Sequence, residues 1–93
     1  MAWVETIKVR AAGNKETDAD ETLPDTIKKI GSAPGLADIK YCVHGNVPGD
    51  RMIILIWETP RPPILGSELS HCLIQELKRF GPVDYSVWVE KSV

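Results

Sequence analysis

Apolar and polar residues alternate along three short segments of the chain, residues 3–11, 38–45 and 83–90. Such alternation is typical of a β-strand that buries one face and exposes the other to water. Because side chains two residues apart share a face, each segment has one apolar side that is expected to meet the core. The side chains predicted on that side are Ile7, Val9, Ala11, Ile39, Tyr41, Val43, Tyr85, Val87 and Val89.

A fourth strand is predicted over residues 51–59, RMIILIWET, but it lacks the alternation. The run MIILIW is apolar without a break, so both faces of this strand should be covered. The turn-forming stretch GNVPGD before it predicts a β-hairpin with residues 38–45. A symmetric register pairs Tyr41 with Ile54 and turns Trp57 away from the helices. A slip of one residue reverses this, and the sequence leaves both registers open.

The first of two predicted helices spans residues 22–30. Thr22 is its expected N-cap, Pro24 is tolerated in the first turn, and Gly31 suits the position just past the end. The polar stretch GNKETDADET before it is expected to be a loop. The apolar side of this helix consists of Leu23, Ile27 and Ile30.

The second predicted helix lies within residues 67–81 and has the clearer pattern. Ser67 is its expected cap, and Gly81 with Pro82 ends it. An apolar stripe at helical spacing predicts the face that packs on the sheet. It consists of Leu69, Leu73, Leu77 and Phe80, widened by Cys72 and Ile74.

The element order strand, helix, strand, strand, helix, strand predicts a ferredoxin-like α+β fold over residues 1–93 as a single domain. Right-handed crossovers place both helices on one face of a four-stranded antiparallel sheet. The other face then carries an apolar band from the third strand, with Trp88 beside it. Leaving such a surface in water is unfavourable. We therefore expect a homodimer that packs two sheet faces together.

Composition narrows the range of partners and locations. The formal net charge is -2 and 26% of the residues are charged, so neither nucleic acid nor an anionic membrane is an expected partner. No apolar run approaches the length of about 20 residues that spans a bilayer. Without a recognisable export signal the chain is expected to be cytoplasmic, with Cys42 and Cys72 as free thiols.

Other ferredoxin-like functions find little support in the residues. An RNA-binding protein of this topology presents aromatic side chains on its central strands, where this chain has aliphatic ones. A Cys-x-x-Cys metal carrier motif is missing. Cys42 with His44, and His71 with Cys72, would have to converge to bind zinc, but adjacent helical residues diverge by about 100°. No metal site is expected.

At this point the chain resembles the dimeric α+β barrel superfamily, and within it the family named for antibiotic biosynthesis monooxygenases. The segments APGLADIKYCVHG, ILIWET and FGPVDYSVW carry the resemblance, which covers nearly the whole sequence. It implies small homodimers with a pocket between sheet and helices in each subunit. It also implies that some members oxidise polycyclic aromatic or quinol substrates with dioxygen and without a cofactor.

The resemblance also suggests a site. Trp57 matches the tryptophan that closes the third strand in the family. Tyr41, Tyr85 and the second helix are expected to line a pocket for a small aromatic ligand, with Trp57 and His71 near its mouth. Trp57 also fits a packing role, and His71 fits either a general base or a solvent-exposed helix residue. The alternative function is a non-catalytic effector-binding or dimerisation module.

Overall fold

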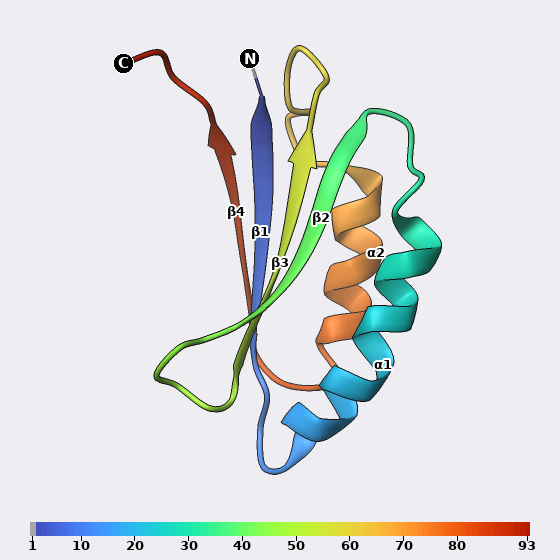
Figure 1. The fold of residues 1–93 in the computed structure, drawn as a ribbon, viewed down its shortest axis with the longest axis vertical. Coiled ribbons are helices and arrows are strands. Elements are labelled where there is room, and N and C mark those ends of the chain that lie inside the picture. The colour runs from blue at the N-terminus through green and yellow to red at the C-terminus, as the bar shows by residue number, and fades with distance from the viewer. Residues whose placement is uncertain (1) are drawn as a thin grey trace.

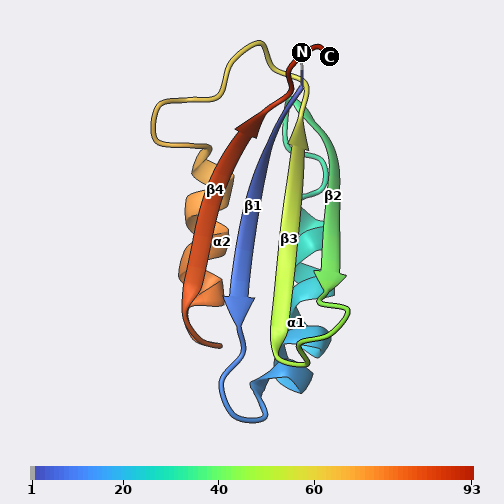
Figure 2. The same ribbon diagram turned by 90° about the vertical axis from the view of Figure 1, so that its left-hand side faces the viewer.

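The six predicted elements are all present in the computed structural model, which describes residues 2–93. The strands form one antiparallel sheet in the order β2-β3-β1-β4, and both helices lie on the same face (Figures 1 and 2). The ferredoxin-like prediction is therefore confirmed. The elements are β1 (Trp3–Arg10), α1 (Lys15–Ile30), β2 (Leu36–Val43), β3 (Asp50–Trp57), α2 (Glu68–Leu77) and β4 (Val83–Val89).

The β2–β3 hairpin adopts the slipped register. Tyr41 pairs with Ile53 rather than Ile54, so every second residue of β3 up to Trp57 faces the helices. Leu55, at 0% exposure, lies at the centre of the resulting core. Trp57 is consequently on the helix side of the sheet. The core also contains Trp3, Ile7, Val9, Ala19, Leu23, Ile53, Leu73, Leu77 and Phe80.

The first helix begins much earlier than its pattern predicted. It starts at Lys15, so the expectation of a loop over GNKETDADET is wrong. Ala19 lies one turn before Leu23 and is buried with it, which extends the apolar side of the helix backwards. Pro24 therefore lies in the helix interior, where it has no N–H to donate to the carbonyl of Asp20. Packing of the apolar side against the sheet outweighs this local cost.

The second helix is capped as predicted, but one of its side chains points elsewhere. The Ser67 hydroxyl accepts a hydrogen bond from the Ser70 backbone N–H at 3.0 Å. Ser70 is fully buried and Cys72 is exposed, so the expectation that Cys72 faces the sheet is wrong. Cys72 lies about 200° around the helix from Ser70. Both cysteines are free, as predicted.

Three valines predicted to meet the helices are exposed to solvent. Val43, Val87 and Val89 have exposures of 57%, 38% and 53%. Val43 and Val89 are the last residues of β2 and β4, and Figure 1 shows the end of β4 running past the nearby helix. The alternation thus predicted the correct side of the sheet but not how far the helices cover it.

Pro24→Ala should stabilise the protein by about 1–2 kcal/mol. A helix-interior proline costs about 3 kcal/mol relative to alanine, part of which is offset because the unfolded chain becomes more flexible. Urea denaturation followed by circular dichroism measures the change. Asp25→Ala, at an exposed position of the same helix, should stay within about 0.5 kcal/mol of wild type. A Pro24→Ala protein no more stable than this control would show that the proline does not strain the helix.

Candidate functional site

A carboxylate lies in the middle of the apolar core. Glu5 is on β1 between Trp3 and Ile7, on the face that meets the helices, and its exposure is 0%. We did not predict this residue as part of a site. The alternation of the strand contained the signal, because position 5 shares a face with positions 7 and 9.

Both carboxylate oxygens of Glu5 accept hydrogen bonds. Oε1 accepts from the Trp57 indole Nε1 at 2.7 Å and from the Ser67 hydroxyl at 2.5 Å. Oε2 accepts from the Ser67 backbone N–H at 3.0 Å and from the Tyr85 hydroxyl. One side chain thus joins β1, β3, β4 and the start of α2. We call Glu5, Trp57, Ser67 and Tyr85 the Glu5 cluster.

The Glu5 cluster holds its carboxylate ionised. Burial by itself would raise the pKa of Glu5, but the hydrogen bonds from Ser67 and Tyr85 outweigh it, and the pKa lies below the ordinary value of 4.5. Burial, together with the bond to Glu5, raises the pKa of Tyr85 to about 12. At neutral pH Tyr85 therefore donates and Glu5 accepts. A carboxylate with a lowered pKa is a poor general base, so Glu5 serves to position its partners.

Trp57 is fixed on a second side by another tryptophan. Its ring stacks on Trp3 with centroids 5.4 Å apart and planes 12° from parallel. The Trp3 indole in turn donates to the Thr59 hydroxyl at 2.7 Å. With an exposure of 6%, Trp57 is held rigidly and largely enclosed.

His71 lies at the edge of the Glu5 cluster. Its ring centroid is 6.4 Å from that of Tyr85, and its Nε2 is 2.6 Å from the Leu65 carbonyl oxygen. Because a carbonyl only accepts, Nε2 must carry the proton. In the neutral ring Nδ1 is then unprotonated, which is the state a general base needs. The side chain is exposed and accessible to a ligand.

The segment after Trp57 borders the same region. Gly66 has φ of +81°, and a Cβ there would lie 1.9 Å from the Tyr85 hydroxyl, so only glycine fits. The preceding Ile64 and Leu65 are 101% and 77% exposed. Two large apolar side chains thus project into solvent beside a tightly fixed turn.

Tyr41 has a different set of partners from the other predicted residues. Its hydroxyl donates to Asp20 on α1 at 2.5 Å, and Arg51 binds the same carboxylate through Nε at 2.7 Å and Nη2 at 3.0 Å. Burial, and then the bond to Asp20, raises the pKa of Tyr41. The structure therefore gathers Trp57, Tyr85 and His71 around Glu5 and ties Tyr41 to the first helix.

The described part of the chain has neither a cluster of metal-binding side chains nor a helix suited to cross a membrane. Across residues 2–93, no three His, Cys, Asp or Glu side chains lie close enough together to hold a metal ion. In the same range, neither helix has the length and apolar character needed to cross a membrane.

Comparisons with known proteins identify the fold. No family model and no curated protein sequence matches the chain. Among solved structures, Rv0793 from Mycobacterium tuberculosis aligns with a TM-score of 0.74 and 10% identity, over 100% of this chain and 98% of that one. A Deinococcus radiodurans protein, provisionally named an antibiotic biosynthesis monooxygenase, aligns with a TM-score of 0.74 and 11% identity, over 98% and 94%.

A third structure carries a more specific name. SnoaB from Streptomyces nogalater, described as a cofactor-independent oxygenase and solved as a point mutant, aligns with a TM-score of 0.72 and 10% identity, over 99% of this chain and 95% of that one. The fold is thus that of the antibiotic biosynthesis monooxygenase-like proteins, as the sequence resemblance predicted. At sequence identities of 10–11%, this likeness shows a shared fold and does not show a shared activity.

Glu5→Gln should lower the free energy of unfolding at pH 7 by about 3 kcal/mol, because it weakens several charge-assisted hydrogen bonds inside the core. The pH dependence should change too. A carboxylate with a lowered pKa contributes stability above its unfolded-state pKa, and this is lost as the pH falls through the folded-state value. The variant should therefore lose less stability than wild type below about pH 4.5.

Urea denaturation between pH 3 and pH 7 measures both effects. Asp20 and Asp50 also have lowered pKa values, so some acid sensitivity should remain in the variant. Glu58→Gln, at an exposed position near the same end of the sheet, is the matched control. Equal stability of Glu5→Gln and Glu58→Gln at pH 7 would contradict the structural role of the cluster.

Proposed function

We propose that this protein is a homodimeric, cofactor-independent oxygenase for a flat aromatic molecule of the quinol or polyketide-phenol type. The observation that carries the proposal is the placement of His71, whose Nε2 is hydrogen-bonded to the Leu65 carbonyl, beside the ring of Tyr85 at the edge of the Glu5 cluster. Nearby aromatic and apolar side chains suit a flat substrate. The shared fold with an oxygenase that needs no cofactor supports the same reading.

The chemistry requires one base and an environment with little water. His71 would remove a proton from a substrate hydroxyl, and the resulting phenolate gives up electrons to dioxygen more readily than the phenol. For a phenol that carries an oxidisable ring CH2 group, the balanced reaction converts CH2 plus dioxygen into C=O plus water, so one oxygen atom enters the product and the other leaves as water. Ile64 and Leu65 would cover the bound ring and exclude water. Glu5 keeps Trp57 and Tyr85 in place.

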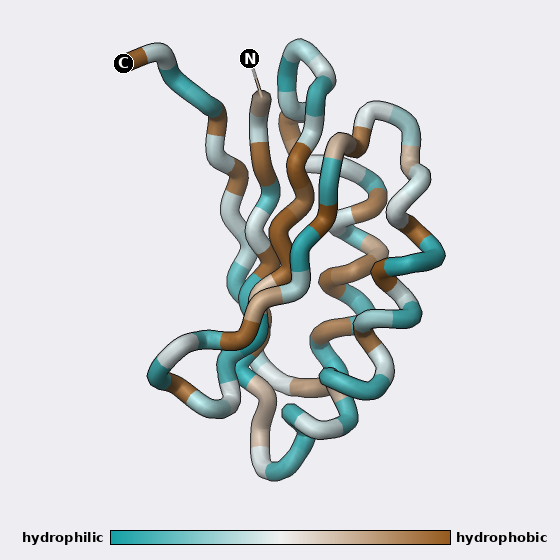
Figure 3. The backbone as a smooth tube through the Cα atoms, in the orientation of Figure 1, coloured by the Kyte–Doolittle hydropathy of each residue, from teal (hydrophilic) through white to brown (hydrophobic). Residues whose placement is uncertain are grey.

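Dimerisation would bury the face of the sheet that the helices leave open. In Figure 2 this open face is turned towards the viewer, and Figure 3 shows the apolar run of β3 within the sheet. By strand register Met52, Ile54 and Ile56 lie on it, each only partly buried, and Trp88 is 62% exposed. A second copy brings the same apolar band to its partner across a two-fold axis.

Size-exclusion chromatography with light scattering should give twice the chain mass at micromolar concentration. Ile54→Asp places a charge in the middle of the apolar band and should yield a folded monomer, because Ile54 is outside the core. Leu65→Asp, on an exposed loop away from the open face, should remain a dimer. A monomeric wild type would refute the dimer.

Oxygen uptake with a panel of quinols and phenols tests the catalytic proposal. Substrates should first be identified by quenching of tryptophan fluorescence. His71→Gln should then lower uptake about 100-fold or more, as expected on loss of a general base. Gln75→Ala, at an exposed position of the same helix, is the control, and it should leave uptake unchanged. Binding without uptake would instead favour the effector-binding module, and failure of every compound to bind would refute both functions.

A further inference from the structure

A hollow of ≈190 Å³ lies at the end of the sheet where β2 turns into β3. Figure 1 shows residues 44–49 bending away from the helices, to the side of the open face. The hollow is therefore separate from the Glu5 cluster, which lies on the helix side. Its lining consists of Lys8, Cys42, Val43, His44, Asp50, Arg51 and Met52.

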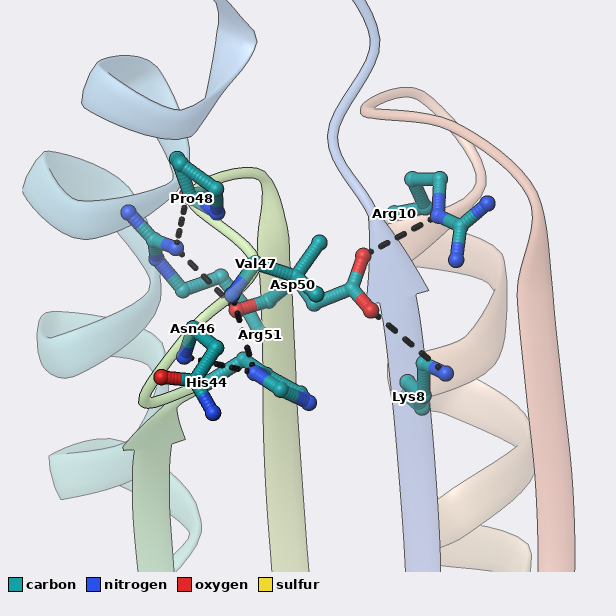
Figure 4. Close-up of polar contacts among 8 residues, drawn as sticks. All are labelled: Lys8, Arg10, His44, Asn46, Val47, Pro48, Asp50 and Arg51. Carbon is teal, nitrogen blue, oxygen red and sulfur yellow. Dashed lines mark hydrogen bonds and ion pairs between the residues drawn. The ribbon is translucent and has the colours of Figure 1, made fainter.

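The position of His44 is set by the hairpin turn. Its Nδ1 accepts hydrogen bonds from the backbone N–H groups of Asn46 at 2.9 Å and Val47 at 3.0 Å (Figure 4). In the neutral ring the proton is then on Nε2. In Figure 4 this second nitrogen points away from the two amides. The turn thus presents a donor in a fixed orientation and leaves no basic nitrogen free to hold a metal.

Lys8 supplies a cation at the hollow, and Asp50 supplies the neighbouring carboxylate. Asp50 is 3% exposed and accepts from Arg10 at 3.1 Å, while Lys8 lies 3.5 Å from its other oxygen. Figure 4 shows these two cations on one carboxylate. Asp84 is the cross-strand neighbour of Lys8, but within residues 2–93 no ion pair joins them. Among the described residues, Lys8 therefore has one close carboxylate partner, Asp50, and its ammonium remains available to a further acceptor.

The remaining walls are apolar or weakly polar. Cys42 and Met52 are direct cross-strand partners on the open face, so their side chains lie side by side. A mostly apolar hollow with a few oriented donors is typical of a small-molecule site. The buried carboxylate of Asp50 would repel a dianion, which favours a ligand with a single negative charge.

We infer that this hollow binds a small monocarboxylate with an apolar body. Lys8 and the His44 Nε2–H bind the carboxylate, and the body packs on Cys42 and Met52. The site is independent of the proposed oxidation, and it lies on the face that a dimer partner would cover. A second subunit therefore closes it, and ligand binding is linked to the association of the two chains.

Titration with benzoate, followed by backbone amide NMR, tests the site. Shifts should concentrate at residues 42–44 and 50–52, with affinity in the millimolar range expected for so small a ligand. Benzamide, which has the same shape and no charge, and inorganic phosphate should each bind at least ~10-fold more weakly. Lys8→Met should weaken the binding of benzoate by a similar factor. Lys40→Met, on the same face but outside the hollow, should leave the binding unchanged.

The two thiols provide an internal control. Benzoate should slow the alkylation of Cys42 but not that of the exposed Cys72, as read by peptide mass spectrometry. Equal binding of benzoate and benzamide, or unchanged binding in Lys8→Met, would overturn the inference. Benzoate shifts confined to the Glu5 cluster would also overturn it. Because His71→Gln leaves this hollow intact, failure of the oxygenase proposal has no effect on this result.

Discussion

The buried carboxylate of Glu5 is the constraint on which the rest of this structure depends. An ionised group in a core is strongly unfavourable unless donors surround it. Here the donors come from three other elements: Trp57 ends β3, Ser67 begins α2, and Tyr85 lies in β4. The end of β3, the start of α2 and the path of β4 are therefore all fixed at the positions where their donors reach Glu5. Because hydrogen bonds are directional, they restrict the relative positions of these elements more than apolar packing alone would.

Ser67 shows how this constraint extends into the helix. Its hydroxyl oxygen accepts from the Ser70 N–H as a helix cap, and the same group donates its proton to Glu5. The start of α2 is thereby tied to β1. Since His71 lies one turn further along α2, its position beside Tyr85 also follows from this connection. A core carboxylate that does no chemistry can in this way determine where a candidate base is held.

The strands were predictable because their alternation depends on local sequence and one buried face. The start of α1 was not, because its polar first turns are stabilised by contacts far away, such as the Lys15 ammonium on the Arg79 carbonyl at 3.1 Å. The register of the hairpin was also open, because β3 is apolar on both faces and either pairing buries similar area. The sequence thus indicated Trp57 as a candidate site residue but left open which face of the sheet it occupies. The sequence did not indicate Glu5 as a core residue, because acidic side chains are almost never fully buried without a partner.

The charged groups on the two faces of the sheet have different kinds of partner. On the helix side, Glu5 has four donors, and Asp20 receives the Tyr41 hydroxyl and two Arg51 nitrogens. On the open face, apolar side chains remain partly exposed, and two cations share the carboxylate of Asp50. In the proposed dimer, a second copy of the chain would supply apolar cover for that face. The proposed monocarboxylate would bind Lys8 on this same face, so subunit association and ligand binding are expected to meet on one surface.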